Sequence, residues 1–344
     1  MDDNVTSGRL GFGATDRCYD VRMRASVVVP VYNSAGSLPL LVDRLREVLE
    51  PGGRLGELIL VNDGSRDHSW RVIESLAARF PWIRGVNLMR NYGQHNALLC
   101  GIRAVRYETV VTIDDDLQMP PEDVPKLLAQ LERGYDVVYG TPQQESHGFA
   151  RNLASRFTKL ALQSAMGADT AQNVSAFRVF RTHLRDAFSN YGGPYVSIDV
   201  LLTWGTKNFS AVSVRNEPRT IGASNYTFGK LLAHAMNMMT GFSTVPLQIA
   251  SITGFLFTFF GFGILIYVLG RYLINGGSVP GFPFLASVIA IFSGAQLFAL
   301  GIIGEYLARM HFRMMDRPSY TIRSTTEASG ERTDSLTSKY ASEA

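Results

Sequence analysis

The stretch "VVTIDDDLQMPPEDV", residues 110–124, joins an apolar, β-branched run to three consecutive aspartates and then to the start of an amphipathic segment. A short run of Val, Ile and Thr bounded by polar residues is typical of a buried strand. Asp114, Asp115 and Asp116 therefore stand at the end of that strand, just before a helix. The pattern predicts a strand and helix unit that delivers concentrated negative charge to one edge of a sheet.

The same alternation of strand and helix patterns continues on both sides, from residue 25 to about residue 216. Further strands are predicted at "SVVVPVY", "ELILVND" and "YDVVYG", and amphipathic helices at "SLPLLVDRLREVL", "SWRVIESLAARF" and "PPEDVPKLLAQLERG". This order indicates an α/β domain with a mainly parallel sheet. Because ligands of such sheets bind beyond the carboxyl ends of the strands, Asp63 and the three aspartates are candidate site residues.

Composition indicates contact with lipid rather than with nucleic acid. The 344 residues are 46% hydrophobic and only 18% charged, which is rich for a purely soluble protein. A net charge of +3 is too small to indicate nucleic acid binding, and no such partner is expected. Cys18 and Cys100 have no metal-ligand spacing and are interpreted as reduced thiols. No secretory signal pattern is found at the N-terminus, so the catalytic part is expected in the cytoplasm.

Two long uncharged segments, residues 245–270 and 272–304, predict a membrane hairpin. Each exceeds the roughly 20 apolar residues that a spanning helix needs. Two buried helices of a soluble bundle are the alternative. Basic residues flank the pair on its outer sides: Arg215, Arg219, Lys230, Arg309, Arg313, Arg317 and Arg323. The positive-inside rule then places the catalytic domain and both termini in the cytoplasm of a multi-pass protein of the inner (plasma) membrane.

These patterns divide the chain into five parts. The expected parts are an N-terminal extension at 1–24, a catalytic domain at 25–225, an interfacial helix at 226–244, two transmembrane helices at 245–308, and a basic segment with a disordered tail at 309–344. A plain linker helix is the alternative for 226–244. We expect the α/β domain to close without the spans.

The acidic cluster has the chemistry of a cation site. Three adjacent carboxylates repel one another, and hard cations such as Mg²⁺ or Mn²⁺ take oxygen ligands together with substrate phosphates. If the strand persists, Asp114 and Asp116 lie on one face and Asp115 on the other. Gln118 could add an amide oxygen. A solvated acidic turn is the alternative.

Four ordered segments resemble the inverting family 2 glycosyltransferases of the GT-A fold: "VVVPVYNSAGSLPLLVDRL", "LILVNDGSRDHS", "RNYGQHNALLCGI" and "IDDDLQMPPEDVPKLL". Later segments, "RTIGASNYTFGKL", "GIIGEYLARM" and "RPSY", resemble polyprenyl-phosphate glycosyltransferases, the group of dolichyl-phosphate mannose synthase and the bacterial undecaprenyl-phosphate glucose and aminoarabinose transferases. The resemblance covers roughly residues 25–322. It implies a Rossmann-like GT-A domain that transfers a sugar, with inversion, from a nucleotide sugar to undecaprenyl or decaprenyl phosphate, for use in cell-envelope glycosylation.

The resemblance also implies roles for single residues. The nucleotide-binding residues would be Pro30, Tyr32, Asn33 and Asp63. The metal ion, Mg²⁺ or Mn²⁺, and the sugar diphosphate would be held by Asp114, Asp116 and Gln118, the two aspartates being the catalytic pair. Phosphate groups, including that of the acceptor, would be received by Arg151, Arg178, Arg219, Ser224 and Lys230. Tyr32 could instead pack, Arg178 could pair with a surface acid, and Asp63 could cap the helix that follows it.

Two positions depart from the family pattern, and other functions stay open. Gln172 stands where the family commonly has an aspartate, whose role could have moved to Asp169, and Asn225 stands where lysine is frequent. A processive polysaccharide synthase is the alternative enzyme, although its Q-x-x-R-W motif is not in the sequence. A noncatalytic membrane scaffold is the alternative class. UDP-sugars are the preferred donors and GDP-mannose the second choice, and the pattern allows a homo-oligomer.

Overall fold

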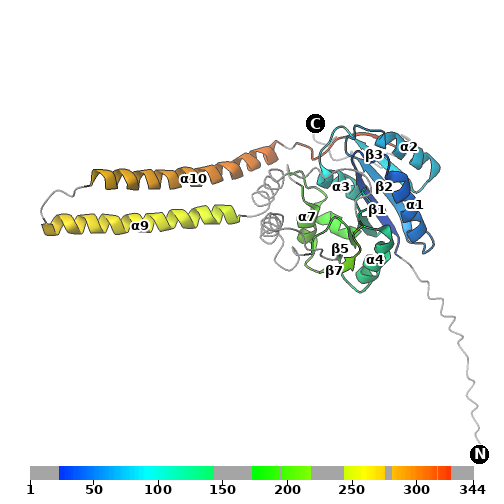
Figure 1. Ribbon diagram of the computed structural model, residues 1–344, viewed down its shortest axis with the longest axis horizontal. Coiled ribbons are helices and arrows are strands. Elements are labelled where there is room, and N and C mark those ends of the chain that lie inside the picture. Colours follow the sequence, from blue (N-terminus) through cyan, green and yellow to red (C-terminus); the bar gives the residue numbers. More distant parts are fainter. Residues whose placement is uncertain are drawn as a thin grey trace, which may run out of the picture.

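The computed structural model describes residues 23–142, 173–193, 196–217, 244–275, 281–315 and 317–326. These residues form a layered α/β domain and a pair of long helices that extends away from it (Figure 1). Residues 317–326 then lead back from the second long helix to the edge of the domain.

One eight-stranded sheet organises the domain. Its strands are β1 (Ala25–Val31), β2 (Leu55–Asn62), β3 (Ile83–Leu88), β4 (Thr109–Thr112), β5 (Val137–Pro142), β6 (Arg178–Arg181), β7 (Phe209–Val214) and β8 (Ile322–Thr325). They follow the order β7-β5-β6-β4-β1-β2-β3-β8. The central strands β4, β1, β2 and β3 are parallel, whereas β6 and β8 run antiparallel to their neighbours in that central group. A mainly parallel sheet, as predicted, therefore forms the core of the domain.

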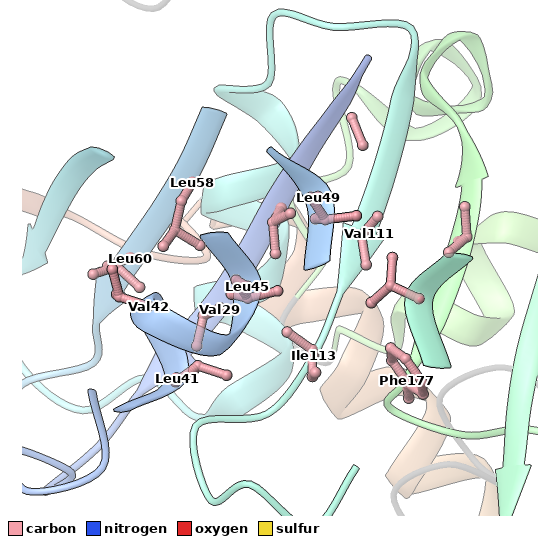
Figure 2. Packing of buried hydrophobic residues seen from close by; sticks show 14 of the residues in the cluster. Val29, Leu41, Val42, Leu45, Leu49, Leu58, Leu60, Val111, Ile113 and Phe177 are labelled. Atoms are coloured by element: carbon pink, nitrogen blue, oxygen red, sulfur yellow. The ribbon is translucent and has the colours of Figure 1, made fainter. Parts of the chain in front are cut away.

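Helices cover both faces of this sheet. The helical segments of the domain are α1 (Leu38–Leu49), α2 (Ser69–Arg79), α3 (Gln94–Arg103), η1 (Pro121–Asp123), α4 (Val124–Glu132), η2 (Thr182–Phe188) and α7 (Ile198–Gly205). Successive side chains of β1 point to opposite faces of the sheet, so the domain has two hydrophobic cores. Val29 packs with Leu45 of α1 on one face (Figure 2). Val28 packs on the opposite face, in the core that contains the apolar residues of α3. Strands buried on both faces read as continuous apolar runs, which is why the sequence revealed them.

The two long helices are α9 (Val245–Asn275) and α10 (Phe282–Met314), which lie side by side (Figure 1). Each contains a stretch long and apolar enough to cross a membrane, Val245–Ile274 and Ile291–Met314, and the most apolar part of each stretch is not buried. Exposed Phe, Leu and Ile side chains surround both helices. Water would penalise so much apolar surface, so the hairpin matches the predicted pair of membrane helices better than a buried bundle.

The end of the chain differs from the sequence prediction. Residues 322–325, assigned to a disordered tail, form strand β8, whose residue Thr325 pairs with Val86 of β3. The segment has only four residues and all of them are exposed, so no periodic burial pattern marks it. Its partner lies more than 200 residues earlier, and backbone pairing over such a separation leaves no signature in local sequence.

We expect Gly64→Ala to destabilise the domain more than the matched change Gly53→Ala. Both glycines have φ of +62°, where a side chain costs more than about 1 kcal/mol. At Gly64 an added Cβ would also lie 2.4 Å from the carbonyl carbon of Arg90, whereas nothing lies within 4 Å at Gly53. Thermal unfolding of the detergent-solubilised variants measures the difference. Equal melting temperatures would contradict the tight approach of the two loops.

Candidate active site

Four loops at the carboxyl ends of the parallel strands meet around one pocket. They follow β1, β2, β3 and β4, as expected for a sheet of this type. The pocket is lined by Pro30, Val31, Tyr32, Asp63, Asn91, Gly93, Gln94, Asp114, Asp115 and Asp116. Predicted nucleotide and metal residues thus come together here.

The three aspartates do not alternate between faces. Strand β4 ends at Thr112, so the aspartates belong to the turn that follows, and all three border the pocket. This corrects the expectation that Asp115 points away. The Asp114 carboxylate accepts a hydrogen bond from the Gln94 amide at 2.6 Å. The Asp115 carboxylate accepts one from the Tyr32 backbone N–H at 3.1 Å. The Asp116 carboxylate accepts one from the Gln118 backbone N–H at 3.1 Å.

Leu117 fixes the acidic turn in place. Its φ is +60°, a left-handed conformation that residues with a side chain rarely adopt, and its side chain is only 2% exposed. Burial of the leucine in the core under α1 and α4 opposes the strain of this backbone. The turn is therefore held so that Asp116 and Gln118 follow a defined path on either side of the buried leucine. Sequence analysis gave no indication of this role.

Asp63 joins two elements at the base of the pocket. Its two carboxylate oxygens accept hydrogen bonds from the backbone N–H groups of Tyr92 and Gly93, at 2.7 and 2.8 Å. Burial raises the pKa of this carboxyl, and the two hydrogen bonds oppose that shift. The carboxylate therefore holds the start of α3 rather than capping the helix that follows it, and it also borders the pocket.

Three residues were predicted from the end of β1 and the loop that follows it, and two of them line the pocket. Pro30 and Tyr32 line it, and the Tyr32 side chain is 41% exposed, so it is open to a ligand. Asn33 instead accepts a hydrogen bond from the backbone N–H of Arg66 at 2.7 Å, with its own φ at +54°. Asn33 thus pins one loop of the pocket to another, and direct contact with a nucleotide stays a prediction.

Arg178 is not placed to receive a phosphate group. It is 1% exposed, its guanidinium forms an ion pair with Asp199 of α7, and it donates to the Thr112 hydroxyl at 3.1 Å. Tyr139 donates a further hydrogen bond to Asp199 at 3.1 Å. A buried charge needs its partner nearby, and Arg178 already has one. The sequence alternative, pairing with an acid, describes its environment, although that acid is buried rather than on the surface.

Several predicted residues lie outside the described part of the chain: Arg151, Asp169, Gln172, Arg219, Ser224, Asn225 and Lys230. Glu217, the last described residue before 218–243, contacts the loop that follows the acidic turn. The Glu217 backbone N–H donates to the Gln118 carbonyl at 2.8 Å, and the Arg44 guanidinium lies 2.7 Å from Glu122 and 3.2 Å from Glu217. Residues 215–217 are therefore fixed against the loop that follows the aspartates. The Gln118 side chain is not among the pocket lining, so its metal role stays a prediction.

The donor groups fit a divalent cation that is shared with a substrate. Within the described ranges, no three His, Cys, Asp or Glu side chains form a ready-made metal cage. Mg²⁺ and Mn²⁺ suit carboxylate oxygens, and Mg²⁺ is usually held by one or two carboxylates with substrate phosphates completing its shell. Burial raises the pKa of Asp115, and the neighbouring charge of Asp116 raises it further. Asp114 and Asp116, the two neighbours of Asp115, would be the residues that hold such an ion.

Three neighbouring pocket residues, Asn91, Gly93 and Gln94, are among those that were not assigned from the sequence. All belong to the segment "RNYGQHN", which was noticed only as part of a resemblance. Gly93 has φ of +92° and precedes α3. Together with the polar residues around it, that glycine was the available signal for a loop that turns sharply beside a ligand.

Comparison with known proteins identifies the family. Residues 26–192 match the family described as "Glycosyl transferase family 2". The chain is 34% identical over 303 residues to the undecaprenyl-phosphate 4-deoxy-4-formamido-L-arabinose transferase of Shewanella sediminis, covering 87% of this chain and 91% of that protein. The transferase of the same name from Klebsiella pneumoniae is 33% identical over 303 residues, covering 87% and 93%. The chain belongs to glycosyltransferase family 2.

The predicted GT-A fold followed by two apolar helices is thereby confirmed. A match over 87% of the chain is too long to stop before α10, so the relatives share the hairpin region as well as the domain. Among solved structures, glucosyl-3-phosphoglycerate synthase of Mycobacterium tuberculosis, in a complex with Mn²⁺, UDP and glucosyl-3-phosphoglycerate, gives a TM-score of 0.49 at 22% identity, covering 63% of this chain and 78% of that one.

We expect Asp115→Asn to raise the melting temperature at pH 7 in the presence of a chelator. The raised pKa means that the folded state disfavours the charged carboxylate, so its contribution to stability is present below the unfolded pKa and is lost as pH rises through the folded pKa. Asparagine removes the charge and keeps an oxygen for the Tyr32 N–H.

The gain should shrink as the pH is lowered through the raised pKa of Asp115, because the wild-type carboxyl then takes up a proton and loses its charge as well. Asp115→Ala, which removes the acceptor oxygen as well, serves as the control and should melt below Asp115→Asn. A metal-free Asp115→Asn protein that melts below the wild type at pH 7 would contradict the assigned burial of charge.

Proposed function

We propose that this protein transfers a sugar from a nucleotide sugar, preferably a UDP-sugar, to polyprenyl phosphate, and inverts the anomeric centre. One observation carries the proposal: relatives named as undecaprenyl-phosphate sugar transferases match the chain over both the domain and the hairpin region. The pocket supports it, because an acidic turn at the carboxyl end of β4 suits a donor that carries a diphosphate.

The chemistry requires positioning more than proton transfer. The acceptor phosphate is already an anion, so one of its oxygens can form the new bond to the anomeric carbon without a protein base. The bond from that carbon to the nucleoside diphosphate breaks, and the diphosphate leaves with the electron pair. In-line displacement of this kind inverts the centre. A divalent cation, when bound, would supply neutralisation of the leaving diphosphate.

Pocket residues would then have separate tasks. Tyr32, exposed at the rim, would contact the base or ribose, while Asp63 keeps the start of α3 at the pocket. Asp114 and Asp116 would hold the ion, and the Gln94 amide would keep the Asp114 carboxylate oriented. Preorganised groups of this kind need little rearrangement when charge develops on the leaving group.

The hairpin would bring the domain to its acceptor at the cytoplasmic face of the inner membrane. Strand β8 follows the hairpin and pairs with β3, so the residues after α10 lie on the same side as the catalytic domain. An apolar hairpin that leaves and returns on one side crosses the bilayer twice.

Reporter fusions test this topology. A fusion after Arg323 should report the cytoplasm, and a fusion at Gly277, between α9 and α10, should report the outside. Both results follow from two crossings with the domain inside. A cytoplasmic signal from the Gly277 fusion would contradict the arrangement.

We expect Asp114→Asn and Asp116→Asn each to lower turnover by about a hundredfold or more, because each removes an anionic ligand and each 1.36 kcal/mol of lost stabilisation is about tenfold in rate. Formation of lipid-linked label from nucleotide sugars, measured against Mn²⁺ concentration, gives the rates. Asp43→Asn is the matched control, since Asp43 lies on α1 and pairs only weakly, at 3.6 Å, with Arg46.

The donor panel would include UDP- and GDP-sugars, beginning with the UDP derivative of the 4-deoxy-4-formamido-L-arabinose named in the relatives. Undecaprenyl and decaprenyl phosphate are the acceptors. Well-folded Asp114 and Asp116 variants with turnover like that of Asp43→Asn would overturn the metal assignment. Wild-type protein that labels no lipid with any donor would overturn the transferase proposal.

A further inference from the structure

The return segment, residues 317–326, connects the end of α10 to the catalytic sheet. Its backbone forms hydrogen bonds along β3: the Met89 N–H donates to the Thr321 carbonyl at 2.9 Å, and the Thr326 N–H donates to the Gly85 carbonyl at 3.0 Å. Side chains add to the pairing, since the Thr326 hydroxyl accepts from the Gly85 N–H at 2.9 Å. Residues 321–326 of this segment are therefore built into the edge of the sheet.

Tyr320 buries the beginning of the return segment in the domain. Its ring packs against the core on the α3 face of the sheet, and burial raises the pKa of its hydroxyl to about 12. The Arg103 guanidinium, at the end of α3, stacks over the ring at 5.7 Å and donates to the hydroxyl at 3.5 Å. Tyr320, six residues after the end of α10, is thus held by a helix of the catalytic domain.

A second contact joins α10 itself to the same place. The Arg313 guanidinium, in the last turn of α10, lies 5.8 Å from the centre of the Tyr191 ring. Arg103 donates to the Tyr191 carbonyl at 2.7 Å, so one arginine holds both Tyr191 and Tyr320. The end of α10 and the end of α3 therefore form one joint.

Helix α3 connects this joint to the pocket. At its first residue, Gln94 donates to Asp114, and the residues just before it hold Asp63. A helix of ten residues is a stiff element, so its two ends move together. Helix α3 therefore sets the distance between the pocket and the joint at the end of α10.

We propose that the return segment is a positioning anchor that holds the pocket at a fixed place relative to the membrane hairpin, with Tyr320 as its central residue. This inference rests on the proposed function in one respect, that the acceptor phosphate lies at the membrane surface. A domain attached to the hairpin only through the chain before α9 could tilt. The return segment gives the domain a second attachment to the hairpin, at the β8 edge of the sheet.

Two measurements test the anchor in full-length protein in lipid nanodiscs. The first needs no activity: spin labels at Arg71→Cys on α2 and Met310→Cys on α10 report the distance between domain and hairpin. The background is Cys18→Ser with Cys100→Ala, because Cys100 is a free thiol beside Tyr320 that Tyr320→Ala would otherwise expose to the label. The wild type should give a narrow distribution and Tyr320→Ala a broad one, while Tyr320→Phe keeps the ring and should stay narrow. A wild-type distribution as broad as that of Tyr320→Ala overturns the proposal.

The second measurement compares acceptors. Tyr320→Ala should lower kcat/KM for polyprenyl phosphate in the bilayer by about tenfold or more, because small displacements of reacting groups are costly, and change that for a short, water-soluble prenyl phosphate by less than about twofold. Tyr135→Ala, a tyrosine packed on the opposite core, is the matched control and should leave the ratio of the two values unchanged. An equal loss on both acceptors for Tyr320→Ala overturns the anchor.

Arg313→Ala keeps the test decisive if Tyr320→Ala folds poorly. Arg313 is exposed, so the change breaks the joint without opening the core. Arg313→Ala should broaden the distribution of label distances, as Tyr320→Ala does. It should also lower the ratio of kcat/KM for polyprenyl phosphate to kcat/KM for the short prenyl phosphate. Unchanged distances and an unchanged ratio in this variant overturn the proposal. Wild-type protein that is inactive on both acceptors counts against the transferase function, whereas the label distances still decide the anchor.

Discussion

The buried carboxylate of Asp63 is the constraint on which the rest of the site depends. It is 3% exposed, and two backbone N–H groups from the loop before α3 satisfy both of its oxygens. A buried charge without such partners would cost several kcal/mol, so the end of β2 and the start of α3 must stay together. From this point α3 extends to Arg103, and that one helix connects the pocket with the return segment.

The neighbouring aspartates of the acidic turn repel one another, and contacts from the surrounding loops must offset this unfavourable energy. Burial raises the pKa of Asp115, and the nearby charge of Asp116 raises it further. Two residues in left-handed conformations, Asn33 and Leu117, lie in the two loops that meet at Asp115. Backbone strain and charge repulsion therefore occur together at the carboxyl ends of the strands. This combination is expected where function, rather than stability, determines which residues are present.

Much of the fold could be predicted because burial on both sides of a parallel sheet produces visible apolar runs, as at Val27–Val31, and because the hairpin is uncharged over great length. The details of the site depended on partners distant in sequence. Asp115 was misplaced because β4 ends at Thr112, earlier than its β-branched pattern suggests. Arg178 was misjudged because its partner, Asp199, belongs to another element. Such pairings arise from tertiary structure and carry no local pattern.

Strand β8 changes how the domain itself should be defined. The catalytic sheet contains strands from both sides of the hairpin in sequence, so a chain that stops before Val245 would lack one edge of the sheet. It would expose the backbone of β3 and the apolar surface that Tyr320 covers. In this fold the sheet is completed only by residues that follow the spans in sequence. The chain therefore connects the catalytic sheet to the membrane hairpin at both ends of the hairpin.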